Sequence, residues 1–400
     1  MKVLYVNHGI TNYLNAALKR ICENGVEIVM SLPESDNGTL GKGVSLINYA
    51  NVLYKIRYSK SVKKWYGKES LIDLKQILLE EQPDILLVGW PYFLQLFFDR
   101  ALLKIVRKND IKLIIQEIPF QTAPFKKLNY YKIHPMYNEN MELQSKGLFF
   151  KIGTLFLMYI RKFVYQYCDA TLNYTTYAYD ILPSYGVDPE SIFVRYNSSD
   201  TDALFAARAQ VENSERILDN VPHVLHIGRL VKWKRVDLLI DAFKLVQQQV
   251  PDSKLVIIGD GPEKENLIDQ AQSLGLSNQI VFTGAVHDPL TLGKYMYAST
   301  VYVLAGMGGL SINDAMTYSL PVICSVCDGT EKDLVTDGVN GFFFKEGDVN
   351  DLAAKIIRIL SDNELAKKMG EASLDVIKNK ININTVAQRY VDVFEYVINK

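Results

Sequence analysis

The sequence predicts an α/β protein built from two doubly wound, Rossmann-like domains. Short apolar runs alternate with amphipathic helical patterns along most of the chain, which is typical of βαβ units and a parallel sheet. The chain has 400 residues, too many for one ordinary hydrophobic core and enough for two. Its composition, 48% hydrophobic and 22% charged, is that of a globular protein.

The first half of the chain supplies the first set of these units. An apolar run near the start precedes a polar loop at residues 7–12 and a helical pattern from about Tyr13 to Glu23. The next runs are short and rich in β-branched residues, as buried parallel strands are. The strands that we expect here are Val3–Val6, Asp84–Val88, Lys112–Gln116 and the less regular Ala170–Asn173.

The second half repeats the alternation more clearly. A turn-rich stretch, Tyr196–Asp202, and a polar stretch, Gln210–Asn220, place the domain boundary near residues 185–215. We therefore expect domains at 1–195 and 196–380, and a helix at 381–400 that packs back on the first domain. The strands expected in the second domain are Val224–Ile227, Lys254–Ile258, Gln279–Phe282, Thr300–Leu304, Pro321–Cys324 and Gly341–Phe344.

Charge and cysteine content restrict the class of protein. The net charge of −1 argues against nucleic acid as a partner, although the first 200 residues carry a basic excess that favours an anionic surface. Four scattered cysteines fit a reducing cytoplasm better than a disulfide framework. Cys324 and Cys327 have CxxC spacing, but no second pair or suitably spaced histidine accompanies them. Met1–Val6 predicts a strand rather than a secretory signal, so we expect a cytoplasmic protein.

One segment admits two interpretations. Residues 147–163 are rich in aromatic side chains, contain Lys151 and end with Arg161 and Lys162. The uninterrupted apolar part is too short to span a bilayer. The segment is either a core helix with a basic end or a helix that lies in a membrane interface with its cations on anionic headgroups.

Two cations follow the first strand of the second domain. Gly228 and Arg229 come directly after Val224–Ile227, and Lys234 precedes an amphipathic run from Val236 to Val246. A strand-to-helix loop lies at the carboxyl edge of a parallel sheet, where α/β proteins bind ligands. Arginine offers a planar donor fork and lysine a point charge, which together suit a diphosphate. This pattern predicts a clamp for the leaving group of a nucleotide sugar.

A glycine-rich turn follows a later strand of the same domain. Ala305–Met316 comes after Thr300–Leu304 and opens a helix. Glycines permit close backbone approach, and a helix amino terminus presents free N–H groups to a phosphate. Asp314 lies about one turn into this helix, where its carboxylate can accept hydrogen bonds from ribose hydroxyls.

These elements belong to an ordered set of motifs between residues 224 and 345. The set is Gly228-Arg229-Leu230 with Lys234, Ile258–Pro262, Phe282–Gly284, Gly308–Leu310 with Asp314–Met316, Leu320–Ile323 and Gly338–Gly341. It resembles the donor domain of GT-B glycosyltransferases, specifically family 4, the retaining enzymes of glycosyl transferases group 1. The first half is similar only in architecture. The resemblance implies two Rossmann-like domains that face an interdomain cleft.

The resemblance also implies roles for residues of the second domain. Arg229 and Lys234 would be catalytic and would neutralise the donor diphosphate, while Asp314 would contact the ribose. The remaining donor-binding positions would be Gly228, Gly284, Val286, Gly308, Gly309 and Leu310, with residues 284 and 286 bordering the base.

Two departures from the family pattern bear on the donor. The first acid of the family's paired-acid motif should fall eight residues before Asp314, where this chain has Gly306. In the family that glutamate contacts the donor sugar, so the donor's identity stays open. Arg235 follows Lys234 where the family often has glycine, which adds a third cation.

The first domain contributes weaker candidates. His8-Gly9-Ile10 stands where such enzymes carry a glycine-rich loop opposite the donor phosphates, so we assign Gly9 to the donor and His8 and Asn12 to the acceptor side of the cleft. Glu117 ends a strand roughly where the family often carries a histidine. It is a candidate catalytic residue that contacts the acceptor hydroxyl or the donor sugar, and the alternative is a structural ion pair.

No metal or cofactor is expected. Asp200 and Asp202 have the acid-x-acid spacing that holds Mg²⁺ and a nucleoside diphosphate in another transferase fold. Here they lie in the linker turn, and Arg229 and Lys234 already supply positive charge. We therefore expect a metal-independent reaction in which the nucleotide sugar is a co-substrate.

The resemblance implies a retaining hexosyltransferase. It would move a hexose-type sugar from a UDP- or GDP-sugar to a lipid-linked glycan in capsule, O-antigen or exopolysaccharide synthesis, at the inner face of the cell membrane. The motif offers no carboxylate nucleophile, so we expect front-face attack in which the leaving phosphate oxygen takes the acceptor proton. Two alternatives stay open: a nucleotide-sugar epimerase or hydrolase of the same fold, and a non-catalytic nucleotide-sugar-binding subunit, which Gly306 suggests.

Overall fold

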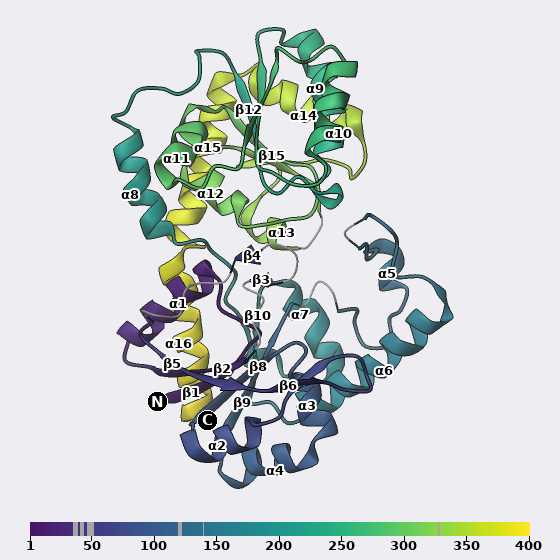
Figure 1. Cartoon of the computed structure of the whole chain (residues 1–400), viewed down its shortest axis with the longest axis vertical. Coiled ribbons are helices and arrows are strands. Elements are labelled where there is room, and N and C mark those ends of the chain that lie inside the picture. The colour runs from purple at the N-terminus through teal and green to yellow at the C-terminus, as the bar shows by residue number, and fades with distance from the viewer. Residues whose placement is uncertain (35–38, 41–43, 46–51, 119–121, 139, 327–328) are drawn as a thin grey trace. The chain divides into compact units, whose positions relative to one another are not determined.

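The computed structural model describes residues 1–34, 39–40, 44–45, 52–118, 122–138, 140–326 and 329–400. These residues form two compact units, each built on its own parallel sheet (Figure 1). The prediction of two doubly wound, Rossmann-like domains is therefore confirmed. Unit 1 comprises Met1–Met136, Ser145–Tyr196 and Ile383–Lys400, and unit 2 comprises Tyr137–Gln144 and Asn197–Asn382.

The main sheet of unit 1 has seven parallel strands. Its order steps outward from β1 in both directions, so β1 and β8 are the neighbours at which the order reverses. Leu4 and Val6 of β1 join one core cluster, whereas Val3 and Tyr5 join the other, because successive side chains of a strand face opposite sides. Both faces of the sheet are therefore buried. In spatial order the strands are β11 (Ile192–Val194), β10 (Ala170–Asn173), β9 (Lys112–Glu117), β8 (Ile85–Gly89), β1 (Lys2–Val6), β2 (Glu27–Pro33) and β5 (Lys55–Ser59).

Helices cover both faces of this sheet, and polar side chains fix where they begin. The Thr11 hydroxyl accepts a hydrogen bond from the Leu14 amide at the start of α1, at 3.4 Å. The last helix, α16, returns to unit 1 and packs along α1 (Figure 1). The helices of unit 1 are α1 (Asn12–Glu23), α2 (Leu74–Glu81), α3 (Phe93–Phe98), α4 (Arg100–Lys108), α5 (Tyr130–Ile133), α6 (Gly147–Tyr165), α7 (Tyr177–Ile181) and α16 (Ile383–Asn399), with short 3-10 helices at Leu182–Tyr185 and Pro189–Ser191.

Two antiparallel strand pairs lie outside the main sheet of unit 1. One pairs β3 (Thr39–Leu40) with β4 (Val44–Ser45), and the other pairs β6 (Ser61–Lys63) with β7 (Glu69–Leu71). The second pair is a hairpin whose turn carries Trp65 and Tyr66.

Helix α6 contains the aromatic segment of residues 147–163. Met158, Ile160 and Val164 are buried in the core, whereas Phe149 is 92% exposed. The helix therefore has both a core face and an exposed apolar face. Among the residues that the structure describes, no helix combines the length and the apolar character needed to cross a membrane.

The sheet of unit 2 has six parallel strands. Counted along the chain, their spatial order is that of dinucleotide-binding Rossmann domains. The order reverses between β12 and β15, so the loops after these two strands flank the usual ligand-binding edge. In spatial order the strands are β14 (Ile280–Gly284), β13 (Lys254–Ile258), β12 (His223–Ile227), β15 (Val301–Leu304), β16 (Val322–Cys324) and β17 (Gly341–Phe343).

The helices of unit 2 bury apolar side chains against this sheet or against one another. Helix α9 begins directly after Arg235, which the backbone holds in the left-handed region at φ +52°. Helix α11 begins with Pro289, behind an Asp288 carboxylate that accepts from the Thr291 amide at 2.8 Å. The helices are α8 (Thr201–Val211), α9 (Val236–Gln249), α10 (Lys264–Ser273), α11 (Pro289–Ala298), α12 (Ser311–Thr317), α13 (Thr330–Leu334), α14 (Val349–Leu360) and α15 (Asn363–Asn379), with a 3-10 turn at Lys232–Lys234.

Candidate active site

The loop after β12 lies against the loop after β13 through backbone contacts. The Gly228 amide donates to the Ile258 carbonyl at 3.0 Å. A Cβ atom on Gly259 would overlap the carbonyl oxygen of Gly228, and one on Gly261 would overlap that of Leu230. These two glycines therefore serve the fold, because they let the loop that carries Arg229 lie close to its neighbour.

Lys234 fixes the loop after β12 to the loop after β15. Its Nζ atom donates to the carbonyl oxygens of Met307 and Gly308, both at 2.8 Å. Gly309 also lies near this nitrogen, since a Cβ on it would stand 3.3 Å from the Nζ atom. The structure thus brings together the two loops that the sequence predicts to share one ligand, at the point where the strand order reverses.

Arg229 is the more available of the two predicted cations. Its side chain is half-buried, and its guanidinium lies 5.9 Å from the centroid of the Trp233 ring. It forms no ion pair with any carboxylate in the described part of the chain. Its donor groups can therefore serve an anionic ligand at this edge.

Gly306 is a point of close backbone contact between the loop after β15 and the loop after β12. The Met307 amide donates to the Trp233 carbonyl at 2.8 Å, which draws the two loops together. A Cβ on Gly306 would overlap that same carbonyl oxygen and would stand 2.6 Å from the carbonyl carbon of Lys234. The position that holds an acid in the family thus has no room for a side chain here.

Asp314 lies in the first turn of α12 and has an unusual environment. Burial raises the pKa of its carboxyl to about 6, against the lowering effect of a hydrogen bond from Ser199. Its Oδ1 atom is enclosed and accepts no hydrogen bond from the described residues. The ribose contact that the resemblance implies for Asp314 stays a prediction.

The other donor-side candidates occupy neighbouring loops. Gly284 ends β14 at φ +73° and accepts a hydrogen bond from the Gly259 amide at 2.9 Å, and Val286 follows it with a half-buried side chain. Leu310 directly precedes α12. His226 of β12 is a core residue: it is fully buried, its Nδ1 atom lies 3.0 Å from the Val303 carbonyl, and burial lowers its pKa to about 4.

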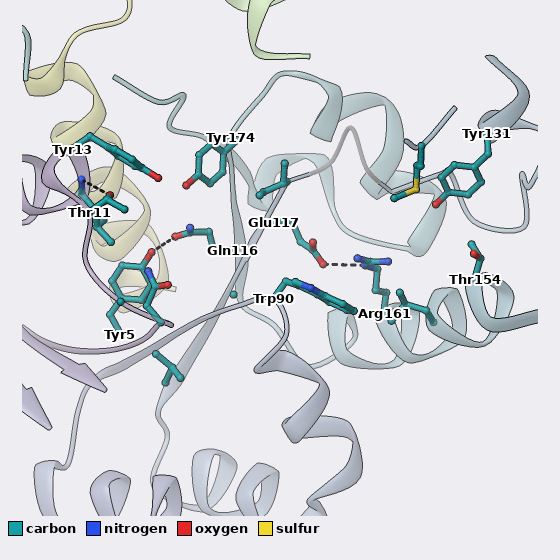
Figure 2. Close-up of a pocket in the computed structure, with 18 of the residues that line it drawn as sticks. Tyr5, Thr11, Tyr13, Trp90, Gln116, Glu117, Tyr131, Thr154, Arg161 and Tyr174 are labelled. Atoms are coloured by element: carbon teal, nitrogen blue, oxygen red, sulfur yellow. Dashed lines mark hydrogen bonds and ion pairs between the residues drawn. The ribbon is translucent and has the colours of Figure 1, made fainter. Parts of the chain in front are cut away.

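Unit 1 has a cavity of about 450 Å³ at its own point of strand-order reversal (Figure 2). It is bordered by the loops after β1 and β8, the end of β9 and one face of α6. Its volume is that of a small-molecule site. One end gathers phenol, hydroxyl and amide groups, and the other end, along α6, is mostly apolar. The polar end is lined by Tyr5, Thr11, Tyr13, Gln116 and Tyr174, and the α6 end by Phe150, Thr154 and Leu157 together with Tyr131 and Met136.

The loop after β1 contributes only part of what the sequence predicts. Gly9 lines the cavity, but His8 and Asn12 are not among its lining residues. The Nδ1 atom of His8 lies 3.0 Å from the Tyr92 hydroxyl, and burial lowers the pKa of the ring. Asn12 is exposed as the first residue of α1. Thr11, the helix cap between them, is the polar side chain that borders the cavity.

Glu117 lines the cavity and also forms an ion pair, so both roles considered for it from the sequence are compatible with the structure. Its Oε1 atom accepts from Arg161 Nε at 3.1 Å and from the Tyr165 hydroxyl at 2.9 Å (Figure 2). Burial would lower the pKa of Arg161, but the charge of Glu117 outweighs it and the pKa is raised. The second carboxylate oxygen of Glu117 accepts nothing from the described residues, so it is available to a hydroxyl in the cavity.

The cavity contains residues that the sequence did not single out. Trp90, Gln116 and Tyr174 each stand at the carboxyl end of a strand, after β8, in β9 and after β10. The Tyr5 hydroxyl donates to Gln116 Oε1 at 2.8 Å, and the Arg195 guanidinium lies 3.9 Å from the Tyr174 ring centroid. Position at a strand end was the one signal that pointed to them.

Candidate metal ligands are dispersed in the described ranges. No group of three histidine, cysteine, aspartate or glutamate side chains gathers there in an arrangement that would hold a metal ion. Asp200 caps α8 by accepting from the Ala203 amide at 3.5 Å. Of the two cysteines with CxxC spacing, Cys324 ends β16 and Cys327 lies outside the described residues.

The family comparison concerns the sequence of unit 2. Residues 208–375 match the family model of glycosyl transferases group 1. A sulfoquinovosyl transferase of Arabidopsis thaliana is 31% identical over 193 residues, which cover 47% of this chain and 34% of that protein. A capsular polysaccharide biosynthesis glycosyltransferase of Staphylococcus aureus is 30% identical over 177 residues, 43% of this chain and 45% of that protein. The chain thus spans less than half the length of these curated relatives.

Similarity to solved structures extends over the whole chain. A crystal structure of HepE from Anabaena in complex with UDP matches with a TM-score of 0.64 at 15% identity, covering 99% of this chain and 100% of that one. At this identity the likeness concerns the fold. This chain therefore has the GT-B fold, and its residues 208–375 match the family of glycosyl transferases group 1.

Proposed function

We propose that this chain is a retaining hexosyltransferase that takes a sugar from a UDP- or GDP-sugar. The observation that supports this most is the pairing of two loops at the strand-order reversal of unit 2. Lys234 joins the loops, and Arg229 stands beside them without a carboxylate partner among the described residues. This arrangement offers fixed positive charge to a diphosphate at the edge where Rossmann-like sheets bind nucleotides.

The same residues would act in the chemical step. Departure of the nucleoside diphosphate places growing negative charge on its phosphate oxygens. Arg229 and Lys234 stabilise that charge more in the transition state than in the ground state. With no side chain at position 306, the loop offers no nucleophile there. We therefore propose front-face attack: the acceptor oxygen bonds to the anomeric carbon, the bond to phosphate breaks, and the phosphate oxygen takes the acceptor proton. The two cations take the part that a metal plays elsewhere, so the reaction needs none.

The acceptor would occupy the cavity of unit 1. Its polar end suits a sugar, because Tyr5, Gln116 and Tyr174 place donors and acceptors beside aromatic rings. Oε2 of Glu117 would accept a hydrogen bond from an acceptor hydroxyl. The apolar end along α6 suits the lipid part of a lipid-linked glycan. We propose that the protein works at the inner face of the cell membrane, in the synthesis of a surface polysaccharide, as the capsular relative's name also suggests.

A thermal-shift panel with UDP, GDP, ADP and CDP tests the donor site. A nucleotide that binds the folded protein raises its melting temperature by mass action. We expect one nucleotide to stabilise the wild type and to stabilise Arg229→Ala much less. Arg358→Ala is the matched control, because Arg358 also lies over an aromatic ring, Phe342, without a carboxylate partner among the described residues. Equal shifts in both variants would place the nucleotide elsewhere.

The same protein distinguishes the two alternatives. If the wild type converts a nucleotide sugar without any acceptor and Glu117→Gln abolishes that turnover, an epimerase or hydrolase replaces the transferase. If a nucleotide binds at Arg229 but no sugar moves with any glycan acceptor, the chain is a binding subunit.

A further inference from the structure

Three segments of unit 1 are strongly and uniformly basic. Residues 60–68 carry four lysines, residues 122–136 carry three and residues 145–163 carry three, and none of the segments contains an aspartate or a glutamate. None of these ten lysines forms an ion pair with a carboxylate that the structure describes. Within the described part of the unit, no carboxylate neutralises their charge by direct contact.

The same segments expose large apolar side chains. Trp65 is 80% exposed in the β6–β7 hairpin, Ile133 is 77% exposed in α5, and Phe149 is 92% exposed in α6. Single exposed apolar residues are ordinary on any protein surface. Here the most exposed ones fall within the three basic segments, which is the pattern of a binding surface.

Helix α6 separates this exterior from the cavity of unit 1. The exposed stripe of α6 consists of Leu148, Ile152, Phe156 and Tyr159, which recur at helical spacing. The opposite face consists of Phe150, Thr154, Leu157 and Arg161, and these residues line the cavity. The helix is thus a wall about 10 Å thick.

Ring contacts connect the three segments into one surface. Phe125 of the second segment lies 5.2 Å from Tyr159 of α6, centroid to centroid, and the Lys162 ammonium lies 4.6 Å from the Phe125 ring. One turn further along α6, Phe163 contacts Phe97 at 5.2 Å. The next residue, Phe98, contacts Trp65 of the hairpin at 5.4 Å. Figure 1 shows α5 and α6 next to each other in unit 1.

We propose that these three segments form a docking surface for an anionic lipid bilayer. Unpaired lysines beside exposed Trp, Phe and Ile side chains match a surface of anionic headgroups over an acyl region. The inference deepens the proposed function, on which it rests for the lipid-linked acceptor. With α6 in the interface, the cavity lies one helix thickness from the headgroups. A sugar carried on a membrane lipid then has only a short distance to cover between the headgroup region and the cavity.

Co-sedimentation with vesicles tests the surface. We expect the wild-type protein to sediment with mixed phosphatidylglycerol and phosphatidylcholine vesicles and to stay in solution with phosphatidylcholine alone. Removing two hairpin charges in Lys63→Gln/Lys64→Gln should weaken the binding roughly fivefold for each lysine. Phe149→Ser/Ile152→Ser should also weaken it, whereas Leu79→Ser should not. Leu79 is 53% exposed on α2, close to the 57% of Ile152, but lies outside the basic segments.

Three outcomes would overturn the proposal. If the wild-type protein does not sediment with anionic vesicles, it has no such docking surface. Equal binding by all variants places the contact elsewhere. Binding of polygalacturonate that depends on the same lysines, without vesicle binding, assigns the surface to an acidic glycan instead. The nucleotide thermal shift is measured without vesicles, so the two hypotheses can fail separately. If no nucleotide shifts the melting temperature but the protein still binds anionic vesicles, the proposed transferase function is rejected and the proposed docking surface is retained.

Discussion

At position 306 the close approach of two loops requires a glycine, because a side chain there would not fit. The sequence places a glycine where the family carries an acid, and this suggested a weakened site. The structure gives a different reason, because the Trp233 carbonyl occupies the space that a Cβ would need. That reason lies more than seventy positions away in the chain, so motif spacing alone does not reveal it.

Restoring the family's acid should therefore damage the site. In Gly306→Glu the new side chain would push Trp233 and Lys234 away from the loop after β15. We expect a loss of about 1–3 kcal/mol in the free energy of unfolding, as for overpacked positions, and loss of the nucleotide thermal shift. Gly153→Glu is the control, since nothing lies within 4 Å of a Cβ on that helical glycine. A Gly306→Glu protein with full stability and improved nucleotide binding would contradict this account.

Asp314 should make donor binding depend on pH. Its pKa of about 6 means that the carboxyl is charged above that pH and protonated below it. A charged carboxylate accepts from a ribose hydroxyl more strongly than a neutral one, so binding should weaken as the pH falls through about 6. We expect roughly a fivefold loss of affinity, measured by calorimetry with a UDP- or GDP-sugar, whose diphosphate does not titrate in this range. In Asp314→Asn the dependence should vanish, and a persisting dependence would assign it to another group.

At the scale of elements, apolar runs decided which strands the sequence predicted. The strands expected within two residues of their observed ends are β1, β8, β9, β10 and all six strands of unit 2, including β14 and β17 at the edges of that sheet. The unpredicted β5 and β11 are the two edges of the sheet in unit 1 and carry short, partly exposed sequences. The third strand of this sheet that was not predicted is β2. It carries the apolar run Ile28–Met30, which is a signal for a strand and should have been used.

The sequence predicted the site in unit 2 better than the cavity in unit 1, because only the first follows local motifs. In unit 2 the edge expected to bind the donor follows recognisable motifs, and Lys234 joins the two loops that carry the predicted residues. In unit 1 the cavity depends on strand order, which places the ends of β1, β8 and β9 side by side. Local sequence patterns do not predict strand order, so Trp90 and Tyr174 were missed. Helix α6 has apolar residues on every side, so its pattern did not distinguish a core face from an exposed one.

At the scale of the whole molecule, the chain leaves unit 1 after Tyr196 and returns to it after Asn382. The returning helix α16 buries Tyr390 and Phe394 in the same core cluster as β1 and α1. The Arg20 side chain of α1 donates to Asn384 Oδ1 at 2.8 Å and joins the two helices again. The stability of unit 1 therefore depends on residues that follow unit 2 in the sequence.

A core substitution in α16 should destabilise unit 1 and spare unit 2. In Phe394→Ala we expect a loss of about 3–5 kcal/mol, as for buried phenylalanines in general. Hydrogen exchange followed by mass spectrometry should show faster exchange in β1 and α1 and unchanged exchange in β12 and β13. Ile398→Ala, at a 42% exposed position of the same helix, should change little. Equal loosening of both units would mean that they unfold together.

The return of α16 also sets an order for folding during synthesis. Unit 2 is continuous from Asn197 to Asn382 apart from one short segment that the chain has made earlier, so its core can close while translation is still under way. The side of α1 that packs against α16 stays uncovered until residues 383–397 have left the ribosome. The core around α1 is thus completed only after unit 2 has been made, and a chaperone would be needed for this stretch of the nascent chain during that time.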